Sequence, residues 1–79
     1  MQVHVRVKPT IPVFITTPGI KLDAFLKLCD AVSTGGQAKM LILDGQVIVN
    51  GIVCLQRGKT LKEGDKVSFG GGHWQVAAR

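Results

Sequence analysis

The stretch GGQAKMLILDGQVIVNG, residues 35–51, places a helix signal directly before a hairpin signal. In its first half, Ala38, Leu41 and Ile42 recur at helical spacing and share one apolar face. Gly45 is well placed to end this helix in a left-handed conformation. The stretch therefore predicts a short helix that is followed at once by strands.

The start of this helix has a signal of its own. Thr34, with Gln37 three residues later, has the form of a capping box, in which the two side chains satisfy backbone N–H groups. Met40 and Leu43 do not lie on the apolar face. We therefore expect this helix either to be covered on two sides or to show some apolar surface.

The second half of the stretch predicts a β-hairpin. Apolar runs at 47–49 and 52–54 flank Asn50-Gly51, a pair that tolerates the positive φ angles of tight two-residue turns. A further turn is predicted at Glu63-Gly64-Asp65. Two more strands are expected at 66–69 and 73–78, joined by the glycine run at 70–72.

Upstream, another helix is predicted to begin near Lys21 and to end at Ser33-Thr34-Gly35-Gly36. Its apolar face would consist of Leu22, Phe25, Leu26, Cys29 and Val32. A short strand is expected at 13–16, and the alternation of Val3, Val5 and Val7 with polar residues indicates a strand with one wet face.

The order of strand, two helices and several short strands indicates the α+β class, with two short helices packed on a small, mostly antiparallel sheet. A chain of 79 residues has room for one modest core. We expect residues 1–12 to be an N-terminal extension or edge strand, and residues 13–79 to form the domain.

The charge of the chain indicates its kind of partner. Ten Lys and Arg against five Asp and Glu give a net charge of +5, which suits nucleic acid, an anionic membrane surface or an acidic protein. No stretch approaches the roughly 20 apolar residues of a membrane span. No secretory signal is recognised either, so we expect a cytoplasmic protein in which Cys29 and Cys54 are reduced.

Catalytic motifs are not found. Ser33 and Ser68 lie in no nucleophile elbow, and the glycines fit neither a phosphate loop nor a dinucleotide fingerprint. The two cysteines and two histidines lack the spacing of a zinc site. A carboxylate pair is not excluded by spacing, but all five acids fall on helix faces or in turns. We expect no enzyme activity, no cofactor, no metal and no small-molecule substrate.

The basic residues fall in three places. Lys21 and Lys27 belong to the first predicted helix and Lys39 to the second, while Arg57 and Lys59 lie in a short polar loop. Exposed cations are common on any surface. The start of the second helix adds free backbone N–H groups and the positive end of a helix dipole, which favour an anion such as phosphate.

The run from Ile20 to Asp65 resembles the S-four RNA-binding domain, named after ribosomal small-subunit protein four. The matching pieces are KLDAFLKL, GGQAKMLI, DGQVIVNG and the turn KEGD after Leu61. TGGQAK and RGKTLKEGD are closer to the small stand-alone bacterial YaaA/YbcJ-like members. The resemblance covers residues 13–79 and implies the αL fold, in which two helices and a hairpin bind folded RNA.

The resemblance also implies an RNA-binding surface. Carried onto this chain, the surface would consist of Lys21, Lys27, Thr34, Gly36, Gln37, Lys39, Arg57 and Lys59. Many members have an Arg just before the second helix, where this chain has Gly35-Gly36, so backbone N–H groups would replace a side-chain contact. The partner would be structured RNA, with ribosomal RNA among the candidates, bound by a monomer.

Two other functions remain open from the residues. One is a protein-interaction module that uses an exposed strand edge and the Met40/Leu43 surface. The other is an accessory domain that guides an RNA-modifying enzyme. Aromatic stacking on bases is not a theme, because Phe25 is expected in the core and Trp74 in strand packing.

Overall fold

The computed structural model describes residues 9–78, and the alternating pattern at 3–7 lies outside them. Within residues 9–78 there are two helices, a five-stranded sheet of order β1-β7-β6-β3-β4 and a separate β2-β5 ladder. The elements are β1 (Thr10–Ile15), β2 (Ile20–Lys21), α1 (Leu22–Leu28), α2 (Gly35–Leu43), β3 (Ile48–Val49), β4 (Ile52–Val53), β5 (Thr60–Leu61), β6 (Lys66–Phe69) and β7 (Gly72–Ala78). The predicted α+β class, with two short helices on a mostly antiparallel sheet, is confirmed.

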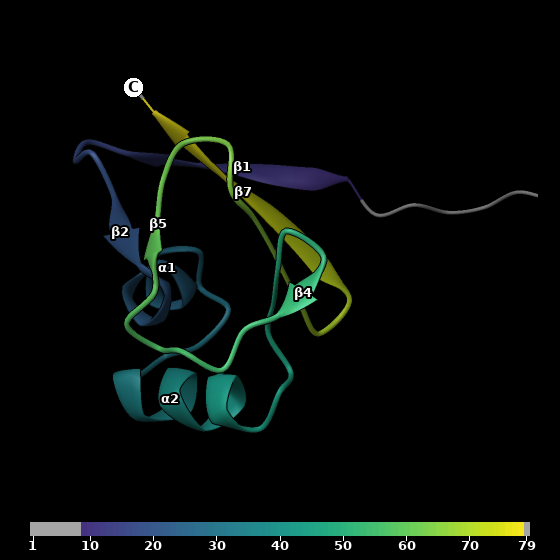
Figure 1. Ribbon diagram of the computed structural model, residues 1–79. Helices are drawn as coiled ribbons and strands as arrows, with labels where there is room; N and C mark the ends of the chain where they lie inside the picture. Colours follow the sequence, from purple (N-terminus) through teal and green to yellow (C-terminus); the bar gives the residue numbers. More distant parts are fainter. Residues whose placement is uncertain (1–8, 79) are drawn as a thin grey trace, which may run out of the picture.

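One edge of the sheet is formed by β1, which runs parallel to β7 from Thr10 opposite His73 to Ile15 opposite Ala78. The two strands cross the molecule side by side, away from the helices (Figure 1). Pro12 is tolerated in β1 because an edge strand does not need every N–H group for pairing. The strand begins before residue 13, so the expected boundary between 12 and 13 falls inside it.

The hydrophobic core lies between the helices and the sheet, and its buried side chains come from both. The expected burial of Phe25 is confirmed, and Trp74 packs half-buried against the core. The buried set is Ile15, Leu22, Phe25, Leu26, Val32, Ala38, Ile42, Val47, Val49, Leu61, Val67 and Val76. Burial on this scale is what holds a small domain together.

Helix α1 is shorter than the apolar spacing predicts. It ends at Leu28, and the prediction that Cys29 and Val32 continue its face is wrong. Val32 is nevertheless buried, because the turn after the helix folds it back onto the core. The buried face of α1 itself is as predicted: Leu22, Phe25 and Leu26.

The end of α1 is set by Asp30, whose φ of 59° lies in the left-handed region. The N–H of Asp30 donates to the carbonyl of Lys27 (3.1 Å), and the N–H of Ala31 donates to the carbonyl of Leu26 (3.0 Å). These two bonds form a Schellman motif, in which glycine is the usual left-handed residue. The missing glycine is why the sequence pattern did not reveal this stop.

Both predicted ends of α2 are confirmed. The Oγ1 atom of Thr34 accepts from the N–H of Gln37 (3.1 Å), and Oε1 of Gln37 accepts from the N–H of Ser33 (2.8 Å). This reciprocal cap reaches one residue further back than the usual box. Gly45 has a φ of 77° and donates to the carbonyl of Ile42 (3.1 Å), which closes the helix.

The faces of α2 differ partly from expectation. Ala38 and Ile42 are fully buried, but Leu41, expected in the core, is only half-buried because it borders a surface hollow. Met40 is 72% exposed and Leu43 is 58% exposed. Of the two expected outcomes, α2 therefore shows apolar surface to solvent.

The predicted turns are also confirmed. Asn50 and Gly51 have φ angles of 51° and 83° in the β3–β4 connection. Gly70 and Gly71 have positive φ angles between β6 and β7, so the reversal there is made by two glycines. These turns hold strands that are otherwise too short to form sheets alone.

Candidate functional site

The β2–β5 ladder brings Lys21 beside the loop that carries the predicted Arg57 and Lys59. Lys21 pairs with Thr60 across the ladder. The approach is close, since a Cβ atom at Gly19 would lie 2.9 Å from Cγ2 of Thr60. A glycine is therefore needed where the chain passes Thr60. The sequence pattern did not predict this ladder, because two-residue strands carry no periodicity.

The loop after β4 binds the N-terminus of α1 through its own carbonyl groups. The carbonyl of Lys59 accepts from the N–H of Leu22 (2.9 Å), and that of Arg57 accepts from the N–H of Asp23 (3.2 Å). Lys21 is the N-cap residue of the helix and makes no side-chain cap bond. The loop thus supplies acceptors that the first turn of a helix lacks.

These bonds place three exposed cations around one helix end, and we call Lys21, Arg57 and Lys59 the α1 cluster. The loop is folded on itself by a bond from the N–H of Lys59 to the carbonyl of Gln56 (3.2 Å). Because the loop already takes up the N–H groups of Leu22 and Asp23, an anion at this end would be held by side chains.

A carboxylate lies close to the same loop. Burial would raise the pKa of Asp65, but hydrogen bonds from the Lys62 N–H and the Asn50 amide, with the charges of Lys62 and Lys59, outweigh it and lower the pKa. Asp65 is thus a negative charge beside Lys59. Its two oxygens accept hydrogen bonds from the Asn50 amide and the Lys62 N–H. The Lys59 side chain is exposed, so its ammonium can still reach a ligand.

The N-terminus of α2 has a different character. The N–H groups of Gly35 and Gly36 meet no acceptor within the described part of the chain, and the first backbone bond runs from Ala38 to Thr34 (3.2 Å). A Cβ atom at Gly35 would meet nothing within 4 Å. Neither glycine has a positive φ. The backbone does not require glycine here, and the absent side chains leave the N–H groups open to an approaching anion.

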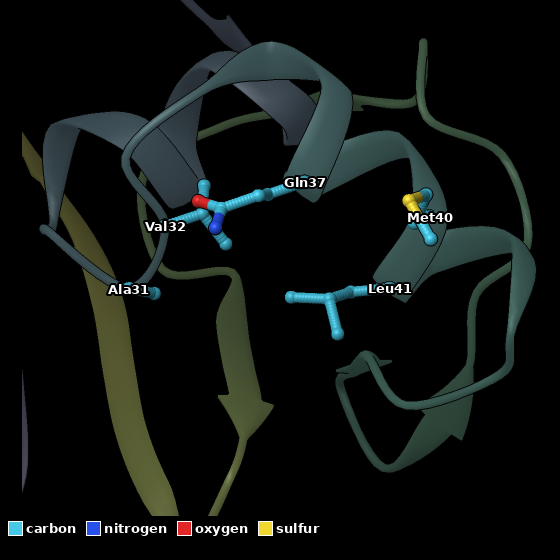
Figure 2. A pocket seen from close by; sticks show the side chains of 5 residues that line it. All are labelled: Ala31, Val32, Gln37, Met40 and Leu41. Carbon is cyan, nitrogen blue, oxygen red and sulfur yellow. The ribbon is translucent and has the colours of Figure 1, made fainter.

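Gln37 is directed along the protein surface more than outward. Figure 2 shows Gln37 and Leu41 extending from α2 toward the segment of Ala31 and Val32, with which they line a hollow. The Gln37 oxygen is already bonded to Ser33. Its NH₂ group can still donate to a ligand, and the oxygen keeps one lone pair that can accept. Thr34, Gly36, Gln37 and Lys39, all exposed, make up what we call the α2 group.

Lys27 does not join the α1 cluster. It lies in the last turn of α1, whereas Lys21 precedes the first turn. Seven helical residues span about 10 Å, so the two lysines are at opposite ends of the helix. Lys27 is exposed and stands at the end from which the chain passes to α2. The eight predicted residues thus lie in two groups and one separate position.

Among residues 9–78, no three His, Cys, Asp or Glu side chains gather in a way that could hold a metal ion. No helix of that region combines the length and apolar character needed to cross a membrane. Cys29 and Cys54 are half-buried free thiols, and burial raises the pKa of Cys29.

Comparisons with known proteins identify the family of this chain. The S4 domain family model matches residues 13–77, so the chain belongs to the S4 domain family. It is 41% identical over 66 residues to the probable ribosome maturation protein RlbA of Bacillus subtilis (strain 168), covering 82% of this chain and 93% of RlbA. It also resembles the solution structure of YbcJ from E. coli, which has an αL motif involved in RNA binding. That likeness has a TM-score of 0.68 and 32% identity, over 99% of this chain and 100% of YbcJ.

Proposed function

We propose that this protein binds structured RNA, without chemistry of its own, through the α1 cluster and the α2 group. The observation that carries the proposal is the pair of bonds from Leu22 and Asp23 to the carbonyls of Lys59 and Arg57. They assemble cations from distant parts of the sequence at one helix end. A folded RNA presents phosphates from several strands, and such grouped cations suit it.

The descriptions of the relatives also support RNA binding. RlbA is described as a probable ribosome maturation protein, and the YbcJ motif as involved in RNA binding. We propose that the RNA is ribosomal RNA or its precursor, bound in the cytoplasm by one copy of this chain. Lys39 and the open N–H groups of Gly35 and Gly36 would hold one phosphate, and the α1 cluster another.

The test is a charge reversal in the α1 cluster with a matched control. Lys59→Glu is expected to weaken binding of purified ribosomal RNA by more than tenfold, a loss above about 1.4 kcal/mol. Lys66→Glu makes the same charge change in β6, outside both groups. Equal weakening by the two variants would show that net charge alone drives binding and that the assigned surface is wrong.

Salt dependence provides a second measurement. With four or five phosphate contacts, log affinity against log salt is expected to slope by about −3 to −4, from roughly 0.7 to 0.9 per contact. A slope near zero contradicts the phosphate contacts.

A protein-interaction module is the second candidate, because Met40 and Leu43 expose apolar surface on α2. An apolar interface shows little salt dependence, so the slope separates the two functions. The accessory-domain alternative uses the same RNA surface. It differs only in requiring an RNA-modifying enzyme as companion, which co-purification from cells would reveal.

A further inference from the structure

A surface hollow of about 350 Å³ lies directly beside the α1 cluster. Its apolar wall includes Val49, Ile52 and Leu55, and its rim includes Gln56 and Lys59. Lys59 belongs both to this hollow and to the α1 cluster. The hollow is therefore continuous with the surface proposed to contact RNA.

Apolar side chains in the wall of this hollow are largely exposed to solvent. Ile52 is 73% exposed and Leu55 is 55% exposed. The hairpin turn at Asn50 and Gly51, which precedes Ile52, is bonded to the rest of the fold through Asn50. Covering this apolar surface would be favourable, because removing it from water releases free energy in proportion to its area.

The polar and charged groups at the rim restrict which kind of ligand could cover the hollow. The Gln56 side chain offers a hydrogen-bond donor and an acceptor, and Lys59 offers a positive charge. By contrast, the hollow beside Met40 and Leu43 is bordered by Asp44, and no lysine or arginine lines it. An occupant of the Ile52 hollow should thus combine an apolar face, a polar edge and an adjoining negative charge.

We propose that this hollow holds one unpaired nucleobase of the bound RNA, which rests on the RNA binding proposed above. A base has apolar faces that can lie on Ile52 and Leu55 and a polar edge that Gln56 can contact. The Lys59 ammonium then contacts the phosphate of the same nucleotide. The α1 cluster and the hollow together select RNA with a base displaced from its helix.

The experiment compares two synthetic RNA duplexes that are identical except for one bulged nucleotide. The protein is expected to bind the bulged duplex about fivefold to tenfold more tightly than the paired one. Ile52→Ser replaces an exposed apolar side chain without changing the charge. It is expected to reduce the ratio of the affinities for the bulged and the paired duplex to about one. Leu55→Ser provides a second variant of the wall, and melting curves confirm that each variant is folded.

A matched control comes from Ile11, which is 51% exposed on β1 at the other edge of the sheet. Ile11→Ser should leave the preference for the bulged duplex unchanged. Equal binding of both duplexes by the unmodified protein, or a preference that survives Ile52→Ser and Leu55→Ser, overturns the nucleobase site. Absence of binding to purified ribosomal RNA and to both duplexes overturns the proposed function itself.

Discussion

The side-chain amide of Asn50 donates a 3.1 Å hydrogen bond to the carboxylate of Asp65. The other Asp65 oxygen accepts from the N–H of Lys62 (2.9 Å), and Oδ1 of Asn50 accepts from the N–H of Lys66 (2.9 Å). The tip of the β3–β4 hairpin is thereby joined to the turn that precedes β6. This connection lies next to the loop that carries Arg57 and Lys59 of the α1 cluster.

Asp65→Asn is expected to lower the melting temperature at neutral pH, because it removes the charge that these donors stabilise. The folded state lowers the pKa of Asp65 from its ordinary value of 3.8. The stabilisation is therefore present above that value and is lost as pH falls through the lower folded pKa. Melting curves at several pH values should show the gap between the two proteins closing in acid.

Glu63→Gln is the control for this prediction, since it removes a charge from an exposed residue of the same turn. Its melting temperature at neutral pH should stay close to that of the unmodified protein. If Asp65→Asn and Glu63→Gln behave alike, the hydrogen bonds of Asp65 contribute nothing specific.

Asp30→Gly is expected to stabilise the protein. Asp30 has a φ of 59°, a conformation that glycine adopts without the steric cost of a Cβ atom. The gain should be about 0.5 kcal/mol, or roughly 2–4 °C in melting temperature. Asp44→Gly should do the opposite, because Asp44 ends α2 at a φ of −80° and its carboxylate accepts from Gln46. A fall in melting temperature for Asp30→Gly would contradict this reading of the α1 terminus.

Phe25→Ala is expected to cost about 3–5 kcal/mol, because Phe25 is fully buried between α1 and the sheet. Leu28→Ala on the same helix should cost less than about 1 kcal/mol, because Leu28 is 52% exposed. Denaturant unfolding measures both. Similar losses for the two variants would mean that burial does not separate these positions.

Lys39→Glu tests the α2 group separately from the α1 cluster. Lys39 is exposed and lies within the first turns of α2, where the helix dipole favours an anion. The change is expected to weaken RNA binding by more than tenfold and to shift stability by no more than about 0.5 kcal/mol. RNA affinity at one salt concentration, with melting curves, checks both. The control variant Lys66→Glu should lose less RNA affinity than Lys39→Glu. Equal losses would show that the α2 group makes no specific contribution to RNA binding.

The apolar spacing in α2 and the turn residues Asn50-Gly51 were sufficient to predict a helix followed by a hairpin. These features are local: a cap bond joins residues three apart, and a two-residue turn depends on its own φ angles. The predicted end of α1 was wrong because its local signal is missing. Asp30 takes a left-handed conformation without the glycine that usually signals it.

Of the candidate surface, the sequence indicated which residues carry charge and which begin a helix, since both are properties of short segments. It could not indicate that Lys59 bonds to Leu22, that Gln37 turns toward Val32, or that Asn50 reaches Asp65. The turn alone explains why Asn and Gly occupy positions 50 and 51. The sequence therefore holds no additional signal for the bond from Asn50 to Asp65. Only the tertiary structure decides such contacts, because they depend on how segments distant in the chain pack around one core.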